Sequence, residues 1–150
     1  SSSLSIENFC DGNGACIGDR FDYKRGHGTG VLSIIAAEGV HGDACWTGAL
    51  PGVNVRMVDI EQNNNYEDGA LNVPSTLNGG FFQAIYEGHK CGGGKLSRVV
   101  NLSWGSTVSL GSYQPLSRQT DDFMYHHRDF NVIVSVGNMG SHSASSMIAS

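Results

Sequence analysis

The order of helical and extended segments is the feature that most constrains the fold of this 150-residue chain. Apolar side chains recur at helical spacing over residues 28–38 (GTGVLSIIAAE), 75–88 and 115–128. Segments rich in β-branched residues alternate with them, at 53–60 (VNVRMVDI), 98–104 (RVVNLSW) and 131–136 (NVIVSV). Because such alternation requires helical crossovers between parallel strands, the sequence predicts an α/β fold, a parallel sheet flanked by helices. The first helix is expected to be short and well buried.

Composition narrows the class of protein. A chain of this length supplies one sizeable core, so we expect a single domain over residues 1–150. Hydrophobic residues make up 39% of the chain and charged residues 15%, a balance that excludes a disordered protein. The net charge of −5, without a block of like charges, argues against nucleic acid or an anionic membrane as a partner. No segment approaches the roughly 18 apolar residues of a membrane span, and no targeting segment is recognisable.

The four cysteines indicate the redox environment. They are even in number and lack a C-x-x-C pair, which favours two disulfide bonds over zinc binding or four free buried thiols. Two disulfides imply an extracellular or other oxidising compartment. We predict the pairs Cys10–Cys16, which closes a short glycine-containing loop, and Cys45–Cys91, which joins two surface insertions.

Three places along the chain carry residues suited to catalysis. His27 lies between two glycines at a helix start, where small neighbours leave its imidazole open to a reactant. Asn138 follows a strand, so its amide is placed as an oxyanion donor would be. The segment 103–105 (SWG) ends another strand, where a glycine lets an extended peptide approach. Taken singly, each feature is also typical of a capping histidine, a turn asparagine or an ordinary loop.

The four segments GHGTGVLSIIAA, ALPGVNVRMVDI, RVVNLSWGS and VIVSVGNMGS together resemble, in order and context, the subtilisin-like serine proteases (peptidase family S8). The resemblance covers the chain from about Arg25 onward, although Gly30 stands where the family usually has histidine. It implies a three-layer α/β architecture and a serine endopeptidase that acts on peptides or proteins. No cofactor is required, and structural calcium is compatible with the family; no metal ligand is assigned. The resemblance implies that His27 is the general base and Asn138 the oxyanion donor. It implies that the substrate backbone binds along Ser103, Trp104 and Gly105. One wall of the specificity pocket would consist of Ser135, Val136 and Gly137.

Two members of the catalytic triad are not evident in this sequence. In subtilisin the acid precedes the histidine by about thirty residues, whereas Asp11, Asp19 and Asp22 all lie closer to His27 and are interpreted as loop acids. Ser146 lies eight positions after Asn138, whereas subtilisin separates its oxyanion asparagine from its nucleophilic serine by about 66 residues. Ser146 is therefore not interpreted as the nucleophile. We therefore expect an incomplete catalytic domain whose aspartate and nucleophilic serine lie outside this chain and which is inactive alone.

Two other functions stay open. The first is a catalytically inactive subtilisin-like domain that binds peptides or partners at the edge formed by residues 103–105. The second is a metal site. Adjacent side chains on a helix point about 100° apart, so His126 and His127 are poorly placed to chelate one ion. The histidines considered for such a site are His27, His41, His89, His126 and His127.

Overall fold

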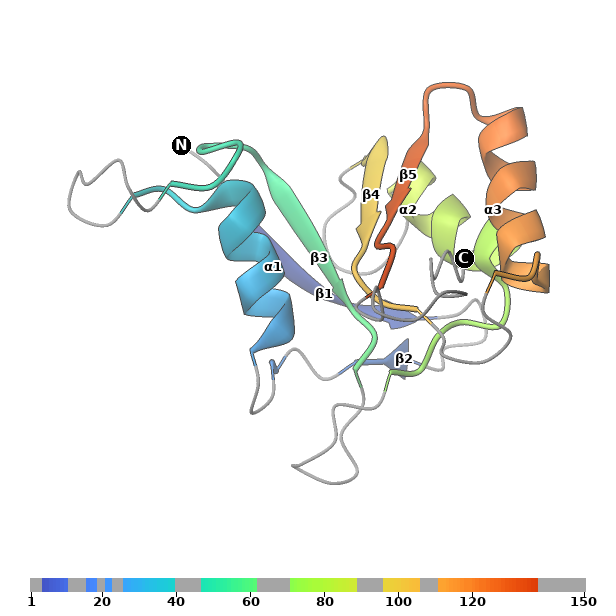
Figure 1. The fold of residues 1–150 in the computed structure, drawn as a ribbon, viewed down its shortest axis with the longest axis horizontal. Helices are drawn as coiled ribbons and strands as arrows, with labels where there is room; N and C mark the ends of the chain where they lie inside the picture. Colours follow the sequence, from blue (N-terminus) through green and yellow to red (C-terminus); the bar gives the residue numbers. More distant parts are fainter. Residues whose placement is uncertain are drawn as a thin grey trace. The chain divides into compact units, whose positions relative to one another are not determined.

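The computed structural model describes residues 4–10, 16–18, 21–22, 26–39, 47–61, 71–88, 96–105 and 111–137. The chain divides into two compact units, Ser1–Val73 and Pro74–Ser150. Their elements are drawn in Figure 1, and each unit is described by itself.

The first unit is built on a three-stranded sheet of order β2-β1-β3. Strand β1 (Leu4–Cys10) runs parallel to β3 (Val55–Asp59), with Leu4 opposite Val55 and Asn8 opposite Asp59. The short β2 (Cys16–Ile17) returns antiparallel to β1. Strand β3 falls within the strand predicted at 53–60, whereas β1 and β2 are not evident from the sequence. Polar residues interrupt the apolar pattern of β1, and its parallel partner is remote along the chain.

Helix α1 (His27–Ala36) lies over one face of the β1–β3 pair (Figure 1). The helix predicted at 28–38 is therefore present, but the prediction that it is well buried is wrong. None of its residues is buried, and Ile34 is 74% exposed. One helix on a narrow sheet shields a single stripe of side chains, which includes the half-buried Leu32. The chain then returns alongside the helix end, where the amide of Gly48 donates to the carbonyl oxygen of Ala37 (2.8 Å).

The second unit pairs β4 (Val99–Leu102) in parallel with β5 (Asn131–Val134). Helix α3 (Pro115–His126) connects the two strands and contacts β5. Its start is encoded locally: Pro115 occupies the first turn, and Gln114 and Ser117 form a reciprocal capping box. Upstream, the π-helix η3 (Leu77–Phe82) runs into α2 (Gln83–Glu87). Gly88 ends α2 with φ 72°, as the predicted glycine stop requires.

Aromatic rings fill the core of the second unit. Phe82 is fully buried, and its ring centroid lies 5.5 Å from that of Phe123 and 5.6 Å from that of Phe130. These are the tilted and edge-on arrangements that aromatic quadrupoles favour. Among the residues of this unit that the structure describes, the other buried hydrophobic ones are Leu77, Phe81, Ile85, Val100 and Leu102. Burying them holds η3, α2, α3 and the strand pair together.

The α/β prediction is confirmed: each unit combines helical structure with a parallel strand pair, and each predicted helix and strand has a counterpart. Within the described ranges the strands form two small sheets. Within the second predicted helix, the segment Leu77–Phe82 is wound as a π-helix, with the amide of Phe81 bonded to the carbonyl oxygen of Thr76 (3.3 Å). None of the helices in these ranges is long and apolar enough to cross a membrane.

Candidate active site

His27 is the first residue of α1 and is exposed. The residue before it, Gly26, adopts the left-handed conformation (φ 54°, ψ 36°) that glycine tolerates best, and its carbonyl oxygen accepts the first helical bond, from Gly30 (2.8 Å). Being glycine, Gly26 offers no side chain to cap the helix. His27 is therefore exposed at the first position of the helix, next to a residue without a side chain.

Asp22 supplies the cap that Gly26 lacks. The amide of Thr29, the third residue of α1, donates a hydrogen bond to Oδ2 of Asp22 (2.8 Å). The sequence indicates only a loop acid at this position and does not predict its hydrogen bond to the helix start. The available signal was an acidic residue shortly before a helix that opens with glycine, because a carboxylate interacts favourably with the positive end of a helix.

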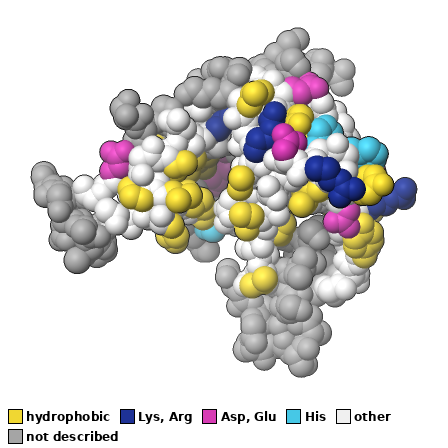
Figure 2. Space-filling model, turned by 90° about the horizontal axis from the view of Figure 1, so that it is seen from above, with side chains coloured by type: hydrophobic (Ala, Val, Ile, Leu, Met, Phe, Trp, Pro, Cys, Tyr) yellow, Lys and Arg dark blue, Asp and Glu magenta, His cyan; other side chains and the backbone are white. Residues whose placement is uncertain are grey.

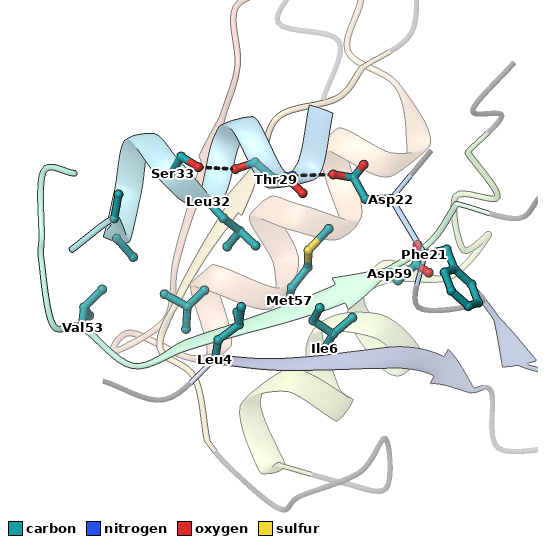
Figure 3. A pocket seen from close by; sticks show the side chains of 13 residues that line it. Leu4, Ile6, Phe21, Asp22, Thr29, Leu32, Ser33, Val53, Met57 and Asp59 are labelled. Atoms are coloured by element: carbon teal, nitrogen blue, oxygen red, sulfur yellow. Dashed lines mark hydrogen bonds between the residues drawn. The ribbon is translucent and has the colours of Figure 1, made fainter. Parts of the chain in front are cut away.

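The glycine after His27 lets α1 approach the sheet. A Cβ atom built on Gly28 would collide with Cε of Met57, which projects from β3 toward the helix (Figure 3). Between the helix and the sheet lies a cavity of about 300 Å³, lined mainly by apolar side chains such as Leu4, Ile6 and Leu32. Asp22 and Thr29 lie at its edge, joined by the hydrogen bond drawn there (Figure 3). The cavity therefore lies next to the first turn of α1, and most of its lining has no polar groups that could take part in catalysis.

In the second unit the parallel pair brings two predicted segments to one edge. Leu102 is opposite Val134, and the amide of Ser135 donates to the carbonyl oxygen of Leu102 (3.0 Å). Residues 103–105 and 135–137 therefore leave the carboxyl ends of neighbouring strands side by side, as expected for the functional edge of a parallel sheet. These segments contain Ser103, Trp104, Gly105, Ser135, Val136 and Gly137.

The exposure of the side chains varies along the two segments. Ser103 and Trp104 are half-buried, whereas Gly105 is exposed and Val136 is 64% exposed. Nδ2 of Asn101 donates to Oγ of Ser103 (2.8 Å), which ties the first segment to its own strand. Gly137 has φ 78°, a conformation that requires glycine and turns the chain at the end of the second segment.

Asn138 lies outside the described residues, so its role as oxyanion donor stays a prediction. The same is true of Ser146, Asp11 and Asp19, and of Cys45 and Cys91. His27 belongs to the first unit and the two strand-end segments to the second. The distances given above for these residues therefore each lie within one unit.

A separate polar network lies at the opposite ends of β4 and β5. Nε of Arg98 contacts Oδ2 of Asp129 at 2.8 Å, and the Tyr86 hydroxyl donates to Oδ1 (2.9 Å). The Arg98 guanidinium also covers the Tyr86 ring, 3.8 Å from its centroid. The hydrogen bond from Tyr86 and the charge of Arg98 lower the pKa of Asp129, and the same bond to Asp129 raises the pKa of Tyr86.

His126, the last residue of α3, and His127, which follows it, both contact the helix backbone. Nδ1 of His126 lies 2.8 Å from the carbonyl oxygen of Asp122, and Nδ1 of His127 lies 3.0 Å from that of Phe123. Each ring is thus engaged with the backbone one helical turn earlier. No group of three or more histidine, cysteine, aspartate or glutamate residues suited to a metal ion occurs in the part of the chain that the structure describes.

Comparison with models of protein families gives a match over residues 12–149, to the family described as the subtilase family (peptidase S8). The match includes His27 and both strand-end segments. No curated protein and no solved structure matches the chain significantly.

Proposed function

The chain belongs to the subtilase family, and we propose that it is the part of a serine endopeptidase that carries the general base, His27, and the oxyanion donor, Asn138. The observation that carries this proposal is the family match across nearly the whole chain, together with an exposed histidine at the open start of α1. A general base must reach its proton without steric hindrance. The small glycines on both sides of His27 support this role.

The proposed reaction is acyl transfer through a serine nucleophile. His27 accepts the proton of the serine hydroxyl as its oxygen attacks the scissile carbonyl, and the side-chain amide of Asn138 donates to the oxyanion. His27 then returns the proton to the departing amine, which leaves an acyl-enzyme. Water repeats the attack with His27 again as base, releasing the acid and restoring the serine.

The proposed substrate is an extended peptide bound along residues 103–105, with residues 135–137 opposite. Support comes from the common edge at which both segments leave their strands. An added strand would gain main-chain hydrogen bonds, and an exposed glycine at position 105 lets its backbone come close. Regular main-chain contacts of this kind hold several peptide units in one orientation.

We propose that the nucleophilic serine and the triad aspartate are supplied by segments other than residues 1–150. No D-[ST]-G or G-T-S-M motif occurs in this sequence. A fluorophosphonate probe tests the proposal: the complete enzyme should be labelled, and the 150-residue chain alone should not. Labelling of the isolated chain at Ser146, abolished by Ser146→Ala, would contradict it. Absence of labelling in the complete protein, with peptide binding retained, would instead support an inactive binding module.

Removal of the general base is the strongest kinetic test. In the complete enzyme, His27→Ala should lower kcat by about 10⁴- to 10⁶-fold, because no group would remain to accept the serine proton. The measurement is turnover of a peptide substrate, normalised to folded enzyme. Wild-type turnover in this variant would remove His27 from the mechanism.

The oxyanion donor has a distinct kinetic signature. Asn138→Ala should lower kcat by about 10²- to 10³-fold with little change in KM, because the lost hydrogen bond forms mainly in the transition state. Asn131→Ala is the matched control, since Asn131 is an exposed asparagine at the other end of β5. A raised KM with unchanged kcat would reassign Asn138 to substrate binding.

The substrate rail is tested at Gly105. Gly105→Val should lower kcat/KM for long peptides by about tenfold or more, since a side chain there would stand in the path of the substrate. Turnover of a short ester that does not span the groove should change little. Equal turnover of long peptides by wild type and variant would place the groove elsewhere.

We also propose that the enzyme functions in an extracellular or other oxidising compartment, without a cofactor for the reaction and with calcium, if bound, in a structural role. The backbone register supports one part of this proposal, because it pairs Cys10 with Cys16 across β1 and β2. Mass measurement of the native protein before and after reduction tests it. Four freely alkylated thiols would contradict it.

A further inference from the structure

We infer that Asp22 is a positioning residue for His27: its carboxylate fixes the first turn of α1 and thereby the direction in which the imidazole projects. The inference rests on the proposed role of His27 as general base. It is carried by the hydrogen bond from the amide of Thr29 to Oδ2 of Asp22 (2.8 Å), which spans the histidine.

The start of α1 lacks the usual means of satisfying its free amides. The first amides of a helix have no carbonyl partner within the helix, and a serine, threonine, asparagine or aspartate at the N-cap normally accepts from the third residue. Gly26 occupies that position, and the first turn contains no acidic residue. In place of an N-cap side chain, Asp22 accepts the hydrogen bond from the amide of Thr29, which lies seven residues later in the chain.

The same turn is unusually permissive because His27 lies between two glycines. Gly26 already uses the left-handed region, and neither glycine restricts the backbone as a residue with a Cβ would. The Asp22 carboxylate lies against both: a Cβ built on Gly26 would be 3.8 Å from Oδ2, and one built on Gly28 would be 3.8 Å from Oδ1. The carboxylate is thus packed over the backbone on either side of His27.

The charge of Asp22 and its hydrogen bond to Thr29 both restrict the first turn of α1. A carboxylate near the first turn is stabilised by the partial positive charge at the helix N-terminus. The bond from Thr29 to Asp22 also closes a loop of the chain that contains His27. The glycines give the imidazole open access, and the carboxylate restricts the motion that such access would otherwise bring. Catalysis depends on this restriction, since small misplacements of a catalytic group lower turnover strongly.

The test uses three variants of the complete enzyme. Asp22→Ala removes the acceptor, whereas Asp22→Asn keeps a side-chain oxygen at the same place. Ser33→Ala is the matched control, because it removes a hydrogen bond to the carbonyl oxygen of the same residue, Thr29 (2.8 Å), and leaves the bond from the Thr29 amide to Asp22 in place. The readouts are kcat and KM normalised to titrated active sites, thermal unfolding, and hydrogen exchange of the Thr29 amide.

We expect Asp22→Ala to lower kcat about tenfold with KM changed less than about twofold, and to accelerate exchange of the Thr29 amide about tenfold. Asp22→Asn should return kcat to within about threefold of wild type, and Ser33→Ala should leave kcat unchanged. A lower melting temperature with wild-type kcat in Asp22→Ala would overturn the positioning role. So would a loss of kcat in Asp22→Asn as large as in Asp22→Ala.

His27→Ala separates this inference from the proposed function. If His27→Ala abolishes turnover while Asp22→Ala retains wild-type kcat, the proposed function stands and the positioning role falls. If His27→Ala keeps wild-type turnover, the proposed function fails, and the positioning role fails with it. The Thr29 exchange rate then still shows whether Asp22 caps the helix.

Discussion

Helix α1 and the aromatic core of the second unit are built in opposite ways. In α1 no residue is buried, and the helix start is held by glycine conformations and a carboxylate cap. In the second unit Phe82, Phe123 and Phe130 pack ring against ring, and Phe82 has no exposed surface. Figure 2 shows that hydrophobic side chains also reach the surface of the molecule, and Ile34 of α1 is among the exposed ones.

The comparison distinguishes residues that stabilise the fold from residues that orient a catalytic group. Apolar burial is non-directional and adds to stability wherever side chains pack densely. Glycines and a capping carboxylate contribute less to stability but define a direction, which a general base requires. Substitutions in the aromatic core should therefore change unfolding, and substitutions at the start of α1 should change turnover.

The largest effect on stability is expected in the aromatic core. Phe82→Ala should lower the free energy of unfolding by about 3–5 kcal/mol, because it leaves a cavity among rings that cannot collapse fully. Ile34→Ala in α1 is the comparison and should change it by less than about 0.5 kcal/mol. Urea unfolding measures both. An equal loss of unfolding free energy in the two variants would contradict the proposed difference between α1 and the aromatic core.

A second effect distinguishes two glycines of the first unit. Gly48→Ala should destabilise by about 1–3 kcal/mol, because its Cβ would lie 2.7 Å from the backbone nitrogens of Ala36 and Ala37. Gly30→Ala, within α1 and with nothing within 4 Å of a Cβ, should stabilise by about 0.5–1 kcal/mol. Thermal unfolding of both variants tests this. A destabilising Gly30→Ala would show that α1 is more closely packed than its exposure indicates.

The hairpin of the first unit offers a third test. Residues directly opposite in an antiparallel pair have Cα atoms about 4.5–5.5 Å apart, within the range that disulfides span. Cys10 and Cys16 are such a pair, so we predict a bond between them that stabilises this hairpin by about 2 kcal/mol. Peptide mapping without reduction should recover the linked peptides. A bond from either residue to Cys45 or Cys91 would refute the pairing.

The smallest effect is expected at the polar network of the second unit. The pKa of Asp129 is lowered in the folded state, so its contribution to stability is present above the ordinary carboxyl pKa of about 4 and lost as the pH falls through the folded value. The pKa of Tyr86 is raised, so its contribution is lost only as the pH rises above about 10. Wild type should exceed Asp129→Asn slightly in stability at neutral pH, and the two should converge in acid. Parallel pH profiles would remove the network from the stability of this unit.

The sequence anticipated the regular elements well because their patterns are local. The apolar spacing of α1 and α3, and the β-branched runs of β3, β4 and β5, depend on neighbours a few residues away. It missed β1, whose pairing with β3 is remote along the chain. It also missed the π-helical turn of η3, where the amide of Leu77 donates to Oε1 of Gln119 from α3 (2.6 Å).

For the candidate site, the sequence by itself determined the residue types: a histidine between glycines, a strand-end S-W-G and a second strand ending in V-G. Tertiary structure decided which strand ends share an edge, since the bond from Ser135 to Leu102 depends on parallel register. It also decided that Asp22, one acid among several near His27, caps α1. Short-range patterns encode helices and strands, whereas hydrogen bonds between separate segments form only once the chain has folded.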